Sequence, residues 1–318
     1  MASTRESKKA ASAPLVLVTG AAGGPQGATG RVLSHLLLER GVRVRALVRT
    51  DDDRAAALRA AGAEVVLGNL LSHTDMQRAA RGVDYMYFSF AVQDGLLEAS
   101  TVAAVVAAEA GLKGVINNSQ WCADLLSVSP QARRHALAEA VFDAFPTPVV
   151  NLRGATYNIN MIVQLGGVAR ELGLLAAPGM ASSDVLPLVS GTDVAAAADA
   201  ILQDFDSFAG QAVLMVSQLR SIASIAKDFS AAFGREVAVK TIDASTWEAQ
   251  VRKKRPNLDD TAIAHLKALW EIMREGCQDV ALMARLEAAQ ARLAGILGRK
   301  PITFEEDLAR FTKASAAK

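Results

Sequence analysis

The sequence has few cysteines, no long apolar run and no marked excess of one charge. Its two cysteines, Cys122 and Cys277, cannot build a disulfide framework, and no Cys/His cluster has the spacing of a metal site. The 34 lysine and arginine residues nearly balance the 33 acidic residues, which argues against nucleic acid or a membrane surface as a partner. No apolar stretch approaches the length that spans a membrane. We therefore expect a cytoplasmic protein without a metal site.

The first 14 residues are small, polar and basic and contain no apolar core segment. A secretory signal needs such a segment, so we predict a disordered leader over residues 1–14 instead. The remaining chain is long enough for one large or two modest domains with ample core.

Short apolar strands alternate with helices through the N-terminal half. Strands are predicted at residues 15–18, 42–48, 63–67, 85–90, 114–118 and 147–152. Helices are predicted at 30–39, 55–61, 75–81, 96–110 and 131–145, then at 193–202, 221–233 and over much of 247–313, with a short strand at 236–241. Such alternation is typical of a doubly wound parallel sheet with helices on both faces. We predict an α/β, Rossmann-type domain over residues 15–152. A smaller, mostly helical lobe over 153–318 covers its carboxyl edge, and its chain is free to return to the sheet.

A glycine-rich turn joins the first predicted strand to the first predicted helix. The stretch LVLVTGAAGGPQGATGRVL holds Gly20, Gly23, Gly24 and Gly27, whereas Gln26 stands where a third regularly spaced glycine is expected. In a strand–turn–helix unit, the backbone N–H groups of such a turn and the helix N-terminus bind a pyrophosphate. Glycine suits this place because a Cβ would block the close approach of phosphate oxygens. We favour a dinucleotide cradle over the alternative, a flexible hinge between two core elements.

The residue that ends the second strand distinguishes the two nicotinamide cofactors. An acidic residue there accepts from the ribose 2′-OH, whereas an arginine pairs with the 2′-phosphate of NADP. Here the strand ends at Val48 and Arg49. This favours NADPH, because a guanidinium binds phosphate through two parallel hydrogen bonds. In the alternative, Arg49 is a solvated charge. The aspartates at 51–53 then cap the next helix, or one of them binds the ribose and favours NAD.

Nine stretches carry a resemblance to a known family. They are TGAAG at 19–23, VRALVR at 44–49, AEVVLGNL at 63–70, GVDYMYF at 82–88, INNSQ at 116–120, SPQARRHALAEAVF at 129–142, VVNLRGATY at 149–157, AGQAVLM at 209–215 and GRKPITFEEDLARF at 298–311. Together they resemble the NmrA-like family, an atypical branch of the short-chain dehydrogenases/reductases, over nearly the whole chain after the leader. The resemblance implies a Rossmann domain that binds NAD(P)H and a small C-terminal substrate lobe. It also implies one of two functions: NADPH-dependent reduction of quinones, dyes or other conjugated molecules, or non-catalytic sensing of the dinucleotide.

The resemblance also assigns residues to the cofactor by matching position. These are Gly20, Gly23, Gly24, Gln26 and Gly27 in the turn, Arg49 at the 2′-phosphate, Asn69 and Leu70 at the adenine, Ser89, Phe90 and Ala91 at the second ribose, and Asn118 and Ser119 near the nicotinamide. Two positions depart from the family pattern. Asn69 stands where many members have aspartate, and His135 stands where many have a lysine four residues before a glutamate, here Glu139. No Tyr-x-x-x-Lys pair is present, so carbonyl reduction by that mechanism is disfavoured.

His135, Ser119 and Tyr157 are the predicted catalytic residues. His135 is the favoured proton donor because an imidazole has an ordinary pKa near neutrality; in the alternative it is a helix-surface residue without a role. Ser119 either hydrogen-bonds a substrate oxygen or ends its strand, and Tyr157 either covers the pocket or packs. The predicted pocket walls, a flat apolar slot suited to an aromatic acceptor, are Phe90, Trp121, Tyr157 and Met161. For Trp121 and Met161 the alternative is core packing.

The sequence therefore predicts a reductase that transfers a hydride from NADPH to a small conjugated or aromatic acceptor, such as a quinone or an enone. Quinones need little from a protein beyond orientation, which suits the scarcity of acid and base groups here. The small residues Gly154, Ala155, Gly166 and Gly167 at the lobe junction indicate an open slot. A non-catalytic dinucleotide sensor is the alternative function. The C-terminal helical faces permit a homodimer without requiring one.

Overall fold

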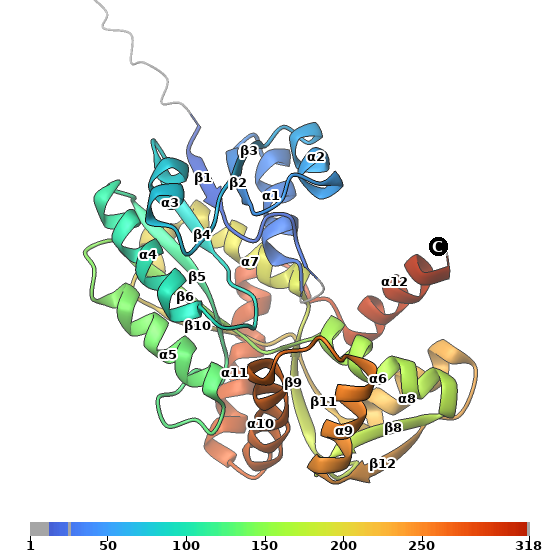
Figure 1. Ribbon diagram of the computed structural model, residues 1–318. Helices are drawn as coiled ribbons and strands as arrows, with labels where there is room; N and C mark the ends of the chain where they lie inside the picture. Colours follow the sequence, from blue (N-terminus) through green and yellow to red (C-terminus); the bar gives the residue numbers. More distant parts are fainter. Residues whose placement is uncertain (1–12, 25–26, 317–318) are drawn as a thin grey trace, which may run out of the picture.

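A seven-stranded parallel sheet forms the centre of the molecule (Figure 1). The structure, a computed structural model, describes residues 13–24 and 27–316, so the predicted leader lies outside the described residues up to position 12. The strands are β1 (Leu15–Val18), β2 (Arg43–Val48), β3 (Glu64–Leu67), β4 (Tyr85–Phe88), β5 (Gly114–Gln120), β6 (Val149–Gly154) and β10 (Ala212–Met215). Their order is β3-β2-β1-β4-β5-β6-β10, and every neighbouring pair is parallel. This confirms the predicted Rossmann-type α/β class.

Helices cover both faces of this sheet because its strands are apolar on both sides. Along β1, Val16 and Val18 pack in the core on one face, and Leu15 and Leu17 in the core on the other. The first face is covered by α1 (Thr29–Glu39), α2 (Asp53–Ala60), α7 (Gly191–Gln203) and α11 (Val280–Leu297). The second is covered by α3 (His73–Ala80), α4 (Leu96–Glu109) and α5 (Pro130–Asp143) (Figure 1).

The second lobe lies beside the carboxyl edge of the sheet and has its own core. Its helices are α6 (Asn158–Leu172), α8 (Ile222–Phe233), α9 (Ala244–Lys254), α10 (Asp260–Gly276) and α12 (Phe304–Ala316). Its strands are β7 (Thr156–Tyr157), β8 (Leu174–Pro178), β9 (Val185–Val189), β11 (Gln218–Ser221) and β12 (Ala238–Ile242). They form two small sheets, β11-β9-β7 and β12-β8. A short 3-10 helix, η1 (Phe205–Ser207), precedes β10.

The chain crosses between the two lobes more than once. After β6 it builds α6, β8 and β9 in the second lobe, returns to the large sheet through α7 and β10, and later returns again with α11. The sheet therefore contains segments from both sides of residue 152. None of the helices in the described parts of the chain combines the length and the hydropathy that a membrane crossing needs.

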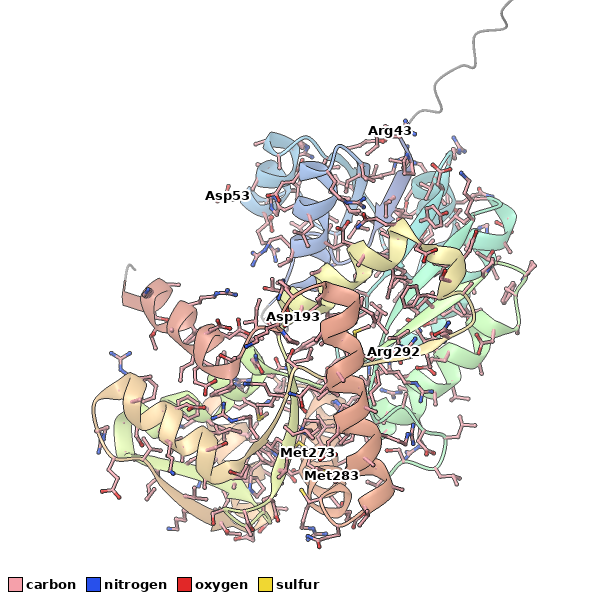
Figure 2. The ribbon with its side chains drawn as sticks, turned by 180° about the vertical axis from the view of Figure 1, so that it is seen from behind. Arg43, Asp53, Asp193, Met273, Met283 and Arg292 are labelled. Carbon is pink, nitrogen blue, oxygen red and sulfur yellow. The ribbon has the colours of Figure 1, made fainter. Side chains whose placement is uncertain are left out.

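A buried carboxylate holds the crossing in place. Asp193, in the first turn of α7, accepts hydrogen bonds from the Ser217 hydroxyl (3.2 Å) and the Ile302 backbone N–H (2.6 Å). Its other oxygen pairs with Arg299 at 2.8 Å. Figure 2 shows Asp193 on the back of the molecule, where α7 begins beside α11. The segment between α11 and α12 is thereby tied to the start of α7.

Candidate functional site

A cavity of about 850 Å³ opens at the carboxyl ends of the central strands, with α6 and α10 of the second lobe on its other side. Its lining includes residues that follow β1, β2, β4 and β5. The strand order reverses between β1 and β4. Open α/β sheets bind their ligands at this switch point, because the loops on either side diverge there.

The glycine turn has the backbone conformation that the phosphate-cradle hypothesis requires. Gly20, Gly23 and Gly27 have φ values of +64°, +71° and +78°, a region that residues with a Cβ rarely adopt. The turn leads to Ala28, which precedes α1 and supplies no side-chain cap. The N-cap side chain therefore satisfies none of the first N–H groups of α1, which is the arrangement found at helix ends that bind anions. Gln26, also predicted here, lies outside the described residues.

Gly30, rather than a residue near position 26, performs the packing function of the third glycine. A Cβ at Gly30 would lie 2.7 Å from the Thr19 carbonyl oxygen and 2.8 Å from that of Gly20. Only glycine lets α1 lie this close to the end of β1. Gly27 does not line the cavity. It lies beneath Tyr157, where an added Cβ would come within 3.1 Å of the ring.

At the end of the cavity beside β2 and α2, the aspartates are paired with arginines, whereas Arg49 is not paired in the described part of the chain. Asp51 accepts two hydrogen bonds from Arg59, at 2.6 and 3.0 Å, and these lower its pKa. Asp52 caps α2 and pairs with Arg54 at 2.6 Å, which lowers its pKa as well. Arg49 lines the cavity, and no hydrogen bond or ion pair holds its side chain within the described residues.

Asp53 completes the set of three aspartates, and none of them lines the cavity. Figure 2 shows Asp53 at the outer side of α2. Arg54, which sequence reasoning did not select, lines the cavity and donates to the Gly23 carbonyl at 3.2 Å. The sequence RTDDDR at residues 49–54 could have indicated Arg54, because it places a second arginine close after the end of β2.

A chain of hydrogen bonds crosses the middle of the cavity wall. The Tyr157 hydroxyl donates to Asn118 Oδ1 at 3.2 Å, and Asn118 Nδ2 donates to Ser89 Oγ at 3.3 Å. The Ser89 N–H in turn donates to Thr19 Oγ1 at 2.7 Å. Burial raises the pKa of Tyr157 to about 12, so its hydroxyl stays protonated at neutral pH. Tyr157 therefore keeps its proton at neutral pH and donates it in the hydrogen bond to Asn118.

Ser119 is held by a partly buried ion pair, Glu139–Arg153. Its hydroxyl donates to Glu139 at 2.5 Å, and Glu139 receives Arg153 through Nη2 (2.5 Å) and Nε (3.0 Å). The Ser119 hydrogen is thus directed away from the cavity. Towards a ligand, this hydroxyl offers only its acceptor lone pairs.

His135 has surroundings that differ from the sequence-based expectation. The side chain is 4% exposed on α5, so it is not a surface residue. Burial, with a further contribution from His265, lowers its pKa to about 3. The assumption of an ordinary pKa near neutrality is therefore wrong for His135. At neutral pH the imidazole is therefore uncharged.

The apolar part of the cavity lies between the two lobes. Phe90 and Trp121 line it as predicted, and Leu266 and Leu269 of α10 face them. The prediction that Met161 lines the pocket is wrong. Its side chain is 3% exposed in the core of the second lobe and does not line the cavity. The residues that α6 contributes to the lining are instead Asn160, Val163 and Gln164.

The predicted junction glycines also divide into two groups. Gly154 and Ala155 line the cavity as predicted. Gly166 and Gly167 lie inside α6, and a Cβ at Gly166 would lie 3.4 Å from the Phe229 ring. A Cβ at Gly167 would meet no atom within 4 Å. Neither glycine lines the cavity, so they do not open the slot.

Most sequence-predicted residues meet in this one cavity. Those that line it are Gly20, Gly23, Gly24, Arg49, Asn69, Leu70, Ser89, Phe90, Ala91, Asn118, Ser119, Trp121, His135 and Tyr157. Sequence reasoning missed the contribution of α10 and of the connection before it, which includes Arg255, Asp259, Ala262, His265, Leu266 and Leu269. No local motif marks these positions, because only the packing of α10 against α5 brings them to the site. Within the described residues, no group of three or more His, Cys, Asp or Glu side chains comes together to hold a metal.

The order of the strands, the glycine turn and the lobe that covers the sheet define the class of this protein. It is a Rossmann-fold protein with a cavity between the sheet and the second lobe. The chain belongs to the NmrA-like family, whose sequence profile matches residues 12–307. Among curated proteins, none matches the sequence at a significant level.

Three solved structures illustrate the range of similar folds. The NADPH-dependent quinone oxidoreductase QOR2 of Escherichia coli, complexed with NADPH, has a TM-score of 0.78 at 19% identity, covering 93% of this chain and 99% of that chain. The Citrobacter sp. triphenylmethane reductase complexed with NADP(H) has a TM-score of 0.76 at 19% identity, with coverage of 93% and 99%. The negative transcriptional regulator NmrA in complex with NADP has a TM-score of 0.78 at 16% identity, with coverage of 96% and 97%. At these identities the similarity establishes the fold.

Proposed function

We propose that this protein is an NADPH-dependent oxidoreductase that reduces a small conjugated or aromatic acceptor of the quinone or enone type. The observation that carries the proposal is the extent of the cavity. It continues from the glycine turn past Asn118 and Tyr157 into the apolar space between Trp121 and Leu269. A protein that only held a dinucleotide would have no need of this second space, whereas a reductase must admit an acceptor beside the nicotinamide.

The residues around the glycine turn fit a dinucleotide phosphate. Gly20 and Gly23 supply a backbone surface without side chains, and the uncapped start of α1 supplies N–H donors. Arg49, which has no side-chain partner among the described residues, suits the 2′-phosphate, while Asp51 and Asp52 are held by arginines. This pattern supports NADPH over NADH.

The chain's own residues orient the reactants and supply hydrogen bonds. Bound NADPH supplies the hydride. Tyr157 and Asn118 are linked at 3.2 Å and present a fixed polar edge next to the glycine turn. His135, uncharged at neutral pH, donates an N–H to the acceptor's oxygen and so stabilises the negative charge that develops there. Because its imidazole carries no extra proton, the proton that completes reduction comes from water.

The test follows NADPH oxidation with a panel of quinones, enones and azo dyes. We expect turnover above background for at least one quinone. We also expect Ala262→Phe, which fills the acceptor end of the cavity, to abolish most turnover and leave NADPH affinity unchanged. Ala264→Phe is the matched control, because Ala264 lies exposed on the same helix. Tight NADPH binding without turnover on any acceptor would overturn the proposal and favour a dinucleotide sensor.

A further inference from the structure

Two buried histidines form the inner wall at the acceptor end of the cavity. His135 of α5 and His265 of α10 both line it and are 4% and 2% exposed. His135 makes no hydrogen bond within the described residues, and its Nδ1 is buried without a partner. A buried polar atom left unpaired costs free energy. The ring itself lines the cavity, and neither of its nitrogens has a partner among the described residues, so a ligand in the cavity can supply a hydrogen bond.

Both ring nitrogens of the second histidine, His265, already have hydrogen-bond partners within the protein. Gln120 Nε2 donates to His265 Nε2 at 3.4 Å, so this ring nitrogen accepts. The hydrogen of His265 therefore sits on Nδ1 and is donated to Ser129 Oγ at 2.8 Å. The two histidines thus differ: His265 is fixed by the protein, whereas His135 keeps its hydrogen-bonding capacity free.

A neighbouring side chain shows the same lack of partners. Gln131, one helical turn before His135 on α5, is completely buried, and neither atom of its amide is hydrogen-bonded. Residues four apart lie on the same face of a helix. This face of α5 thus carries uncharged donors and acceptors that have no partners among the described residues, and of the two side chains His135 lines the cavity.

Charged groups are absent from this part of the lining. Among the described residues, the charged side chains that line the cavity are Arg49 and Arg54 at the end beside β2 and α2, and Arg255 and Asp259 in the connection before α10. Glu139, behind Ser119, is neutralised by Arg153. A cation or an anion bound against His135 would lose its hydration and find no opposite charge, which is costly.

We propose that the cavity selects acceptors by charge, binding flat aromatic molecules whose carbonyl or hydroxyl oxygen is uncharged and hydrogen-bonds to His135. The inference rests on the proposed function, because the ligand is the acceptor of that reaction. Cationic dyes and anionic quinones are disfavoured, since the wall offers hydrogen bonds but no counter-charge. His135 is then the residue that determines specificity.

The first arm of the test measures binding and needs no turnover. Calorimetry on the NADP-loaded protein compares 1-naphthol with naphthalene-1-sulfonate, which have the same ring and differ in charge. We expect 1-naphthol to bind at least about tenfold more tightly. His135→Leu should lower the affinity for 1-naphthol about fivefold and leave naphthalene-1-sulfonate weakly bound, because the variant still offers no counter-charge. His135→Gln, which keeps an uncharged donor and acceptor, should largely restore the affinity for 1-naphthol. The exposed His35 provides the control His35→Leu.

The second arm compares turnover of 1,4-naphthoquinone, its 5-hydroxy derivative, its 2-sulfonate and a cationic triphenylmethane dye. We expect kcat/KM to be highest for the two uncharged quinones, and His135→Leu to lower it most for the 5-hydroxy compound. His135→Leu removes an unpaired buried polar group, so it should fold, which a thermal melt checks.

The two proposals fail in distinguishable ways. Selective 1-naphthol binding that depends on His135, without turnover, would overturn the reductase and keep the charge selection. Turnover with equal use of the sulfonate, unaffected by His135→Leu, would overturn the charge selection and keep the reductase.

Discussion

At the scale of single residues, ion pairing determines which side chains remain available to a cofactor. The sequence places Arg49 next to a cluster of aspartates, and each alternative for the cofactor was consistent with that stretch. In the structure Asp51 and Asp52 are bound by Arg59 and Arg54, and Arg49 lines the cavity. The 2′-phosphate is favoured because the Arg49 side chain is available to bind it, whereas Asp51 and Asp52 are already paired with arginines.

Arg49→Ala should therefore weaken NADPH binding selectively. Loss of charge-assisted hydrogen bonds to the 2′-phosphate costs about 1.5–3 kcal/mol, so we expect the NADPH Kd to rise roughly tenfold to a hundredfold. NADH affinity should not change, because NADH lacks that phosphate. Calorimetric titration with both cofactors measures this. Arg81→Ala is the control, since Arg81 is exposed and does not line the cavity. An equal loss for both cofactors would contradict the assignment of Arg49.

At the scale of secondary-structure elements, the distance between α1 and β1 shapes the phosphate cradle. The sequence shows a strand, a glycine turn and a helix, but it does not reveal which glycine controls their spacing. Gly30 does so, because its missing side chain leaves room for the carbonyl oxygens of Thr19 and Gly20. The start of α1 can then face the cavity.

Gly30→Ala should push α1 away from β1. Overpacking of this kind lowers the free energy of unfolding by about 1–3 kcal/mol, and the displaced helix end should also weaken NADPH binding. Urea denaturation and calorimetry measure the two effects. Gly295→Ala is a matched control inside α11, where an added Cβ meets no atom within 4 Å. There we expect a gain of up to about 1 kcal/mol from helix propensity. A neutral effect of Gly30→Ala would show that the cradle tolerates a wider spacing.

At the scale of the whole molecule, the two lobes meet across uncharged histidines. Burial lowers the pKa of His135 to about 3 and that of His265 to about 4, whereas an unfolded histidine titrates near 6.5. Below pH 6.5 the unfolded chain therefore binds protons that the folded protein does not. Stability is fully present above pH 6.5 and falls as the pH decreases towards 4. Asp228 acts in the opposite sense, because burial raises its pKa to about 6.

His135→Leu should flatten this dependence. Each histidine contributes a slope of up to about 1.4 kcal/mol per pH unit between its folded and unfolded pKa, and the variant removes one of the two. Urea denaturation from pH 4.5 to 7 measures the slope, and the Asp228 contribution cancels because both proteins contain it. His35→Leu should keep the parent slope. Identical slopes in His135→Leu and the parent would mean that His135 is accessible to protons in the folded state.

The local sequence determined where most strands of the large sheet lie. The strands from β1 to β6 are short apolar runs bounded by turn residues, so hydrophobic pattern alone located them to within a few residues. The glycine turn and Arg49 were predictable from their places after the first two strands, since loops at strand ends have a fixed place in this topology. Asn118 was assigned only by the resemblance to the NmrA-like family.

Only the tertiary structure decided which strands form in the second lobe and which side chains face the cavity. The second lobe's strands β7, β8, β9 and β11 are two to five residues long and are stabilised by partners distant in sequence, so no local pattern predicts them. The pKa of His135 depends on burial beneath α10, and His265 reaches the site only through the packing of α10 on α5. Met161 and Val163 differ by two positions on one helix, and only the direction of α6 decides which of them faces the cavity. Sequence pattern thus determines which elements form and where their ends meet. Long-range packing determines which side chains are buried, uncharged and free to bind.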